Sequence, residues 1–346
     1  MSELRKDLIT REWVIIATER SKRPEDFHPH GEHNEARPEY VQSCPFCRGN
    51  EHMVPLPLTS FPPTEMRSTA QEWLVQVVPN KFAALSWQQP LDRRDIGIYD
   101  WMRGTGHHEV IIETPLHNQS LADLSVEHIH WVIQAYIDRY RALREDSRLK
   151  YIMIFKNYGR IAGASLDHSH SQLIAAPFIP QQVWHQVKGS EQYFEYRDCC
   201  PMCDILTVEQ QTGERLILNA GTFQAVAPYM SRYPYEVWLI PQRHVASFAS
   251  MTPEEVLALS GSLQEVLRRL AILLHDPPYN LMIHTSFCQD EDNRLFHWHI
   301  QIVPRLSVAA GFELGTGVFI NMVSPEDAAR HLREGPLAGG TSSSSG

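Results

Sequence analysis

The chain has 346 residues, of which 43% are hydrophobic and 21% charged, values typical of globular proteins and sufficient for two domains. Its formal net charge of −10 opposes the phosphate backbone of nucleic acids, so a nucleic-acid partner is not expected. No apolar run is long enough to span a bilayer, and the charged segment 1–11 lacks the apolar core of a signal peptide. We therefore expect a cytoplasmic protein without a membrane partner, whose cysteines are thiols or metal ligands.

Four features occur in the first half of the chain and recur in the same order in the second. Each half has a Cys-x-x-Cys pair, a strand-like run that leads to a histidine, a helix, and a His-x-His-x-Gln strand. In the first half the short motifs lie at 44–47, 109–113 and 168–172, and in the second half they lie at 200–203, 236–240 and 297–301. This order, together with nearly equal spacing, indicates an internal duplication.

Helix start signals follow the strand-like run in both halves. Ser125 is suited to cap a helix that reaches about Leu143. Thr252, with Glu255 three residues later, predicts a capping box for a helix that reaches about Leu274. Strands are expected next, at 151–155 and 279–284, each leading to its His-x-His-x-Gln strand.

Each half is therefore predicted to be an antiparallel sheet with packed helices, which is an α+β fold. We expect an N-terminal half at 1–185 and a C-terminal half at 186–338, joined near 180–192. Residues 339–346 are glycine, serine and one threonine, and they have no apolar side chain to bury. We expect this tail to be disordered.

The cysteines and histidines of the repeated motifs form two candidate metal sites. A Cys-x-x-Cys pair with two distant histidines offers the tetrahedral sulfur and imidazole ligands that zinc favours. A redox disulfide or plain core packing is the alternative, and the double occurrence favours metal. Cys199 and Cys288 lie outside the pattern and are expected to be inert thiols. The two predicted sets, one zinc ion each, are Cys44, Cys47, His117 and His168, and Cys200, Cys203, His244 and His297.

His168, His170 and Gln172 alternate, so on a strand all three side chains point to one face. If zinc anchors His168, His170 is held beside it as a nucleophile, because neutral imidazole attacks phosphorus without first losing a proton. Gln172 can donate to the phosphoryl oxygens. The alternative is that both histidines are metal ligands.

The segment 157–165 favours the nucleophile, because its glycines and small residues, among them Gly163 and Ser165, allow backbone N–H groups to approach a phosphate. The second half has no such loop before His297, so we assign the nucleophile to His170 and not to His299. Arg20, Lys22 and Arg23 form a short basic cluster that can hold phosphates or can be a solvated surface loop.

With these residues in place, the chain resembles the galactose-1-phosphate uridylyltransferase family, the transferase branch of the histidine triad superfamily, from Arg20 to Glu326. The resemblance implies two histidine-triad-like halves, a uridylylated histidine at His170 with Gln172 as phosphate ligand, and zinc on the first Cys2His2 set. It also implies a homodimer with the active site at the subunit interface, across which Arg20 and Arg23 act. The implied nucleoside contacts are Asn80, Asn157 and Ser165.

The sequence departs from this family in three places. Ser169 stands where the uridylyltransferases have proline, and together with the second Cys2His2 set it resembles the plant ADP-glucose phosphorylases. The Tyr-Glu pair that holds the hexose in galactose enzymes is missing at 312–317. The resemblance therefore leaves open the base, the hexose and the acceptor, and whether zinc fills the second site in the cell.

The predicted function is ping-pong nucleotidyl transfer: His170 takes a nucleoside monophosphate from a nucleoside diphosphate sugar of the UDP-glucose type and passes it to a sugar 1-phosphate. An adenylyltransferase that resembles ADP-glucose phosphorylase, with inorganic phosphate as acceptor, is the alternative. A non-catalytic nucleotide-binding module held together by zinc is a further one.

Overall fold

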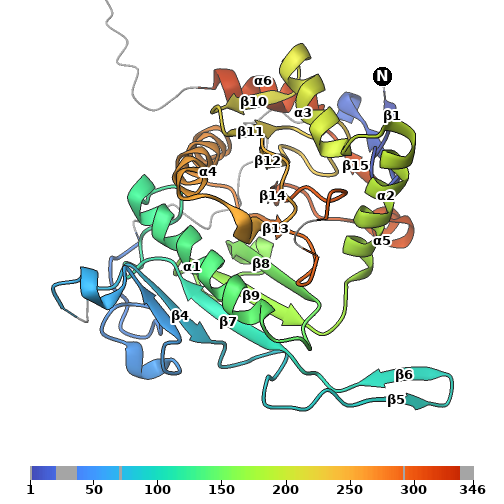
Figure 1. The fold of residues 1–346 in the computed structure, drawn as a ribbon. Helices are drawn as coiled ribbons and strands as arrows, with labels where there is room; N and C mark the ends of the chain where they lie inside the picture. Colours follow the sequence, from blue (N-terminus) through green and yellow to red (C-terminus); the bar gives the residue numbers. More distant parts are fainter. Residues whose placement is uncertain (1, 21–36, 70–71, 291–292, 336–346) are drawn as a thin grey trace, which may run out of the picture.

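The computed structural model describes residues 2–20, 37–69, 72–290 and 293–335 (Figure 1). Ten strands form one continuous sheet: β3 (Thr59–Phe61), β4 (Val75–Pro79), β7 (His107–Ile112), β8 (Tyr151–Tyr158), β9 (His170–Ala176), β10 (Leu216–Asn219), β11 (Phe223–Val226), β12 (Val237–Pro241), β13 (Tyr279–His284) and β14 (His299–Pro304). The strand order is β10-β11-β12-β14-β13-β8-β9-β7-β4-β3, and neighbouring strands are antiparallel.

The two halves of the chain meet inside this sheet. Strand β8 of the first half pairs with β13 of the second, with Asn157 opposite Asn280 and Tyr158 opposite Tyr279. Each half contributes five strands, and the strand that begins with the second histidine of the His-x-His-x-Gln motif lies next to this junction. The predicted α+β fold with antiparallel strands is confirmed, but the two sheets join edge to edge into one.

Two long helices, α1 (Val126–Arg144) and α4 (Pro253–Leu274), pack side by side on one face of the sheet (Figure 1). Both begin as the sequence predicts: the Ser125 side chain accepts from the His128 amide, and Thr252 forms a complete capping box with Glu255. Their apolar sides and the facing strands form a single large core that runs through both halves. The same helix and sheet arrangement therefore supports both His-x-His-x-Gln strands.

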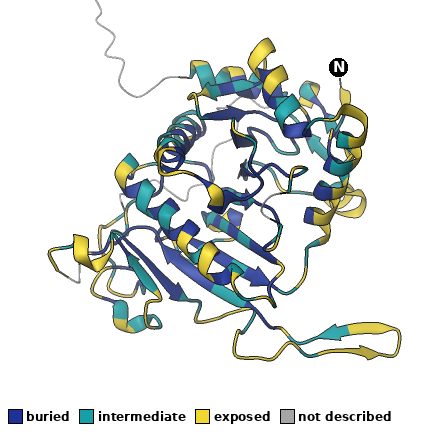
Figure 2. Ribbon diagram, in the orientation of Figure 1, coloured by how far each residue is buried: buried dark blue, intermediate teal, exposed yellow. Residues whose placement is uncertain are grey.

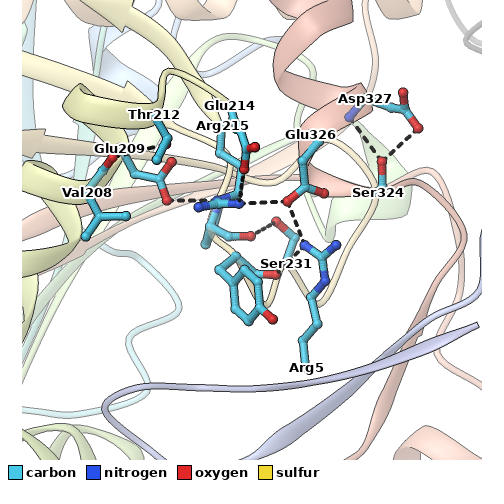
Figure 3. A network of polar contacts seen from close by, with 12 residues as sticks. Arg5, Val208, Glu209, Thr212, Glu214, Arg215, Ser231, Ser324, Glu326 and Asp327 are labelled. Atoms are coloured by element: carbon cyan, nitrogen blue, oxygen red, sulfur yellow. Dashed lines mark hydrogen bonds and ion pairs between the residues drawn. The ribbon is translucent and has the colours of Figure 1, made fainter.

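The N-terminal strands lie against the second half, although the sequence assigned them to the first. A small sheet joins β1 (Glu3–Lys6), β2 (Trp13–Ile16) and β15 (Phe319–Asn321). Glu326, in α6 (Pro325–Glu334), accepts from Arg5 at 2.9 Å and from Arg215 at 2.8 Å, which ties the two chain ends together (Figure 3). The opposite face of the second half is thus covered by residues from both ends of the chain.

The predicted join at 180–192 is a helix, α2 (Gln181–Arg197), followed by α3 (Pro201–Thr212). The glycine-containing segment near 311–317 also forms a short helix, α5 (Gly311–Thr316). Gly189 is required inside α2, because a Cβ there would overlap the carbonyl oxygen of Ile9. The 3-10 turns are η1 (Thr18–Arg20), η3 (Glu51–Met53), η4 (Thr64–Met66), η5 (Arg160–Ala162) and η6 (Phe248–Ser250).

A hairpin of β5 (Arg93–Ile96) and β6 (Tyr99–Met102) projects from the body of the molecule, and it is largely exposed while the centre of the sheet is buried (Figure 2). Among the described residues, no helix combines the length and the apolar character needed to cross a membrane.

Candidate active site

The strand β9 separates two sets of side chains. Ser169 and Ser171 point toward α1, where both hydroxyls bond to Glu113. His170 and Gln172 point to the opposite face of the sheet, where they line a cavity of about 660 Å³. The alternation expected of a strand therefore places the two predicted reacting side chains together, with a separate polar cluster behind them.

His170 is held as a neutral imidazole with one nitrogen free. Its Nδ1 donates to the carbonyl oxygen of His168 at 2.8 Å, which leaves Nε2 unprotonated on the side of the cavity. Burial lowers the pKa of His170 below its ordinary value, with the His168 carbonyl acting in the opposite direction. The ring also contacts Phe46, with 5.2 Å between ring centroids. This geometry suits a nucleophile that needs no base.

The cavity in front of His170 is large enough for a nucleotide and carries a few polar side chains among apolar ones. Its polar members include Asn80, Ser165 and Gln172, which the sequence predicted as contacts. Its lining residues are Ser43, Pro45, Phe46, His52, Met53, Val54, Pro55, Val78, Pro79, Asn80, Lys81, Phe82, Val110, Ser165, Leu166, His170 and Gln172.

Gln172 has a partner that the sequence reasoning missed. His108, on β7, places its Nε2 at 2.9 Å from Oε1 of Gln172 and at 3.0 Å from Nδ2 of Asn80. The same ring accepts from the Ala84 amide through Nδ1 at 3.1 Å. The signal was present, because His108 and Val110 alternate toward the site face, but the pairing with Gln172 depends on strand register.

A buried polar network lies directly behind His170, and the sequence reasoning missed this network as well. Lys156 is 1% exposed and Glu113 0%, and their charged groups are 2.6 Å apart. The Lys156 ammonium also donates to the Ser169 hydroxyl at 3.0 Å and to the His170 carbonyl at 3.2 Å. Tyr136 of α1 donates to the same carboxylate at 3.0 Å.

Burial and the opposite charge of the partner shift the pKa values of Glu113 and Lys156 in opposing directions. Burial raises the pKa of Glu113, but the Lys156 ammonium and the hydroxyls of Ser169 and Ser171 together outweigh burial, and the net pKa lies below the ordinary value. The pKa of Lys156 is lowered by burial, with Glu113 opposing that shift. The two side chains thus bind each other, the His170 carbonyl and the hydroxyls on both sides of His170.

The first Cys2His2 set comes together beside β9. The ligand atoms of Cys44, Cys47, His117 and His168 all lie within 4.8 Å of one another. Three of the sulfur to Nδ1 distances are 3.5, 3.6 and 3.6 Å. Ligands of one tetrahedral zinc ion lie about 3.3–3.8 Å apart, so the set fits such an ion.

The hydrogen bonds of His168 favour the same interpretation. Its Nε2 donates to the Thr114 carbonyl at 2.8 Å, which leaves Nδ1 free for a metal. Burial lowers its pKa to about 4, so the ring stays neutral, as a ligand must.

The second set repeats this arrangement. Cys203 Sγ lies 3.4 Å from Nδ1 of His244 and 3.6 Å from Nδ1 of His297, and Cys200 Sγ lies 4.0 Å from the latter. His297 Nε2 donates to the Pro241 carbonyl at 2.9 Å. Both groups can therefore hold a metal ion through cysteine sulfur and histidine Nδ1.

The cavity beside the second His-x-His-x-Gln strand is much smaller. It measures about 100 Å³, and His299 is stacked on His284 with 4.7 Å between ring centroids. Trp238 lies opposite Gln301 in the sheet, as Val110 lies opposite Gln172. An indole thus stands where the first half has a small side chain.

The remaining predicted contacts lie elsewhere. Asn157 is hydrogen-bonded to Asn280 at 2.8 Å, and Gly163 adopts a left-handed conformation beside it. In the described part of the chain neither residue lines the cavity, and neither does exposed Arg20, which ends η1. Arg23 and Lys22 lie outside the described residues.

The two unassigned cysteines differ in their surroundings. Cys288 is buried in the main core, and burial raises its pKa to about 11. Cys199 is half-buried, and its thiol donates to Asp204 at 3.3 Å. None of the six cysteines forms a disulfide.

Comparison with known proteins identifies the family. The family described as galactose-1-phosphate uridyl transferase, N-terminal domain, matches residues 1–180, and a domain family of unknown function, DUF4921, matches 106–334. The ADP-glucose phosphorylase of Arabidopsis thaliana is 37% identical over 96% of this chain and 92% of its own. The galactose-1-phosphate uridylyltransferase of Thermotoga maritima is 31% identical over 96% and 98%. The chain belongs to the galactose-1-phosphate uridylyltransferase family.

Solved structures agree with this membership. An Arabidopsis thaliana ADP-glucose phosphorylase with bound ADP-glucose has a TM-score of 0.81 and 35% identity, covering 97% of this chain and 100% of that one. A uridylyltransferase structure has a TM-score of 0.74 and 25% identity, covering 96% and 97%. The predicted family and fold are confirmed, and this chain is an enzyme of the nucleotidyl-transfer type.

Proposed function

We propose that this family member transfers a nucleoside monophosphate through a covalent intermediate on His170. The carrying observation is that Nδ1–H of His170 donates to the His168 carbonyl, which leaves Nε2 unprotonated, while His170 and Gln172 line a nucleotide-sized cavity. In the first step Nε2 attacks the α-phosphorus of a nucleoside diphosphate sugar, the N–P bond forms, and the P–O bond to the sugar 1-phosphate breaks. In the second step a phosphate oxygen of the acceptor attacks phosphorus and the N–P bond breaks.

The surrounding residues have distinct parts in this reaction. The His168 carbonyl stabilises the positive charge that develops on the ring, and Gln172 donates to a phosphoryl oxygen. Asn80 and Ser165 bind the nucleotide from the cavity wall. Asn157 and Gly163 shape the loop that presents Ser165.

Arg20 and Arg23 are proposed to act from the second subunit of a homodimer. The support is that η1 follows β2, which lies in the small sheet on the second half, and Arg20 does not line its own chain's cavity in the described residues. The free thiols fit a reducing compartment, so we place the enzyme in the cytoplasm.

Both Cys2His2 groups are proposed to hold zinc, two ions per chain. The mixed sulfur and imidazole ligands and their spacing support zinc. The first ion would fix His168 and thereby the start of β9, and the second would join α3 to the second His-x-His-x-Gln strand. Neither ion takes part in a chemical step.

A UDP-glucose donor with a hexose 1-phosphate acceptor is the first pair to test, because it is the activity in the family's name. ADP-glucose with inorganic phosphate is the second candidate. The relative that is 37% identical is an ADP-glucose phosphorylase, and the motif around His170 has serine in place of proline. In addition, Glu313 of α5, in the segment where the hexose-holding Tyr-Glu pair is missing, accepts a hydrogen bond from the Ala310 amide at 3.1 Å. Its carboxylate is therefore already used within the helix start and does not replace that pair.

The deciding experiment mixes the protein with each nucleotide sugar and measures the intact mass for a retained nucleotidyl group. We expect one adduct per chain with UDP-glucose or ADP-glucose, located on His170 by peptide mapping. Adding galactose 1-phosphate or inorganic phosphate should then discharge it and identify the acceptor. Tight nucleotide-sugar binding without any adduct would support a non-catalytic binding module and refute the proposal.

A further inference from the structure

The side-chain amide of Gln172 has a donor end and an acceptor end, and only the donor end can stabilise a phosphoryl oxygen. The amide lines the cavity next to His170. Its usefulness therefore depends on which end faces the cavity.

The hydrogen bonds of His108 decide this orientation. The Ala84 backbone amide can only donate, and it points at Nδ1 of His108 at 3.1 Å. Nδ1 must therefore be unprotonated, and in the neutral ring the proton lies on Nε2. That Nε2 is 2.9 Å from the Gln172 side chain, and a ring N–H requires an acceptor. The oxygen of Gln172 is consequently bound to His108, and its NH2 group is presented to the cavity.

The orientation of the Asn80 side-chain amide is also determined by its hydrogen bonds. Its Oδ1 accepts from the Phe82 backbone amide at 2.8 Å, so its NH2 group is the end near His108. With the His108 Nε2 proton directed at Gln172, the 3.0 Å approach of Asn80 Nδ2 to Nε2 brings two donors together and is not a hydrogen bond. The Asn80 donors therefore remain for a ligand. The cavity wall thus offers the NH2 groups of Gln172 and Asn80, and the tautomer of His108 leaves both available.

The second half shows the opposite orientation at the matching place. Gln301 donates through Nε2 to Glu236 at 2.7 Å, and its Oε1 faces Nε2 of His284 at 2.9 Å. The two sites match in sheet register. In the second half, Trp238 is opposite Gln301 and Glu236 lies two residues before it. In the first half, Val110 is opposite Gln172 and His108 lies two residues before it. Exchange of a donor for an acceptor at this position therefore reverses the amide.

We propose that His108 is a positioning residue for the reaction: its Nε2 proton orients Gln172 so that the amide donates to the phosphoryl group transferred to His170. This inference rests on the proposed nucleotidyl transfer. The acceptor Glu236, at the same place in the second half, instead binds the donor of Gln301, so that donor is not free for a ligand.

The test compares His108→Gln with His108→Glu. The two new side chains have the same length and shape, and both lose the bond to Ala84. Glutamine can still donate to the Gln172 oxygen. Glutamate can only accept, so the Gln172 amide is expected to turn until its NH2 group faces the new carboxylate. Removal of a donor to a developing oxyanion lowers rates by about 10²–10³-fold. We expect His108→Glu to slow formation of the adduct on His170 by this factor and His108→Gln by less than about tenfold.

Glutamate also adds a negative charge near a phosphate, and a double-mutant cycle separates that effect. The same two substitutions are placed in a Gln172→Leu background, where there is no amide to orient. If His108 acts through Gln172, the difference in adduct-formation rate between the two variants should shrink in this background to the effect of the added charge alone. An undiminished difference in that background, or equal rates for the two variants with Gln172 present, would overturn the proposal.

A spectroscopic measurement keeps the inference separate from the proposed function. In the wild-type protein without substrate, nitrogen-15 shifts of the His108 ring should show a protonated Nε2 and an unprotonated Nδ1. A protonated Nδ1 would refute the orientation argument whatever the activity. If this tautomer is found but the wild-type protein forms no adduct, the proposed transfer fails while the orientation of Gln172 stands.

Discussion

The two halves of this enzyme have the same scaffold and differ at the few positions that face the reacting group. Both have a strand that carries His-x-His-x-Gln, a capped helix behind it and a Cys2His2 group beside it. The first cavity measures about 660 Å³ and the second about 100 Å³, with Trp238 in the place of Val110. The duplicated fold therefore holds the histidine in place, and the side chains around it set the size of the cavity in front of it.

The faces toward the helices differ just as clearly. Behind His170 lie the Lys156 and Glu113 charges with two serines. Behind His299 the flanking residues are Trp298 and Ile300, which belong to the apolar core. A buried ion pair is costly to desolvate. In the described residues it lies behind His170 and has no counterpart behind His299, so we infer that it holds strand β9 in a specific position.

The largest expected effect comes from the two histidines. We expect His170→Ala to reduce nucleotidyl transfer by about 10⁴-fold or more, as loss of a covalent nucleophile does. His299→Ala should leave measurable turnover, because its ring is stacked on His284 in the small cavity. Turnover and intact mass with a nucleotide sugar are the measurements. An adduct that still forms on the His170 variant would contradict the assignment.

The next comparison concerns the metal groups. Cys44→Ser and Cys200→Ser should each reduce bound zinc from two ions to one and lower the free energy of unfolding by several kcal/mol, because metal binding contributes to folding. Only Cys44→Ser is expected to abolish the adduct as well, since His168 immediately precedes the nucleophile strand. Elemental analysis, thermal denaturation and adduct mass test this. Protein with only trace zinc and no response to chelation would refute it.

A smaller effect is expected from the buried ion pair. Lys156→Met leaves the Glu113 charge unpaired and should lower the free energy of unfolding by about 3–5 kcal/mol. The second-half control Ile283→Val should cost only about 0.5–1.5 kcal/mol.

Urea unfolding measures both changes. Adding Glu113→Leu to Lys156→Met should restore most of the stability, because an apolar pair replaces the ion pair. If the single Lys156 variant proves as stable as wild type, the pair does not hold the strand as inferred.

The smallest effect should come from the helix caps. Ser125→Ala and Thr252→Ala are each expected to lower the free energy of unfolding by about 1 kcal/mol. The two variants should lose similar amounts, because each substitution removes one side-chain bond, and in the Thr252 variant the backbone amide still donates to Glu255. Equal midpoints for both variants and wild type would show that packing alone fixes the helix ends.

The sequence predicted the local elements well because their signals are local. The caps at Ser125 and Thr252 and the strand at 279–284 appear in the structure as expected. The α+β class followed from the alternation of strands and helices. The sequence predicts a join near 180–192, where the structure has helix α2, whose few buried positions give a weak periodic pattern.

The candidate site was only partly predictable. His170, Gln172 and both Cys2His2 sets could be proposed because each set is repeated and has a recognisable spacing. His108 could not, because its function depends on which residue of β9 it faces. Lys156 and Glu113 look like ordinary strand residues until the sheet register brings their charges 2.6 Å apart.

The sequence by itself determined the duplication, the two long helices and the two Cys2His2 sets, because these are patterns along the chain, and it predicts His170 and not His299 as the nucleophile. Only the tertiary structure decided that β8 and β13 join two sheets into one and that residues 3–16 cover the second half. It also decided which end of Gln172 faces the cavity. These features depend on strand register and on contacts between distant segments, and backbone pairing of this kind leaves no periodic trace in the sequence.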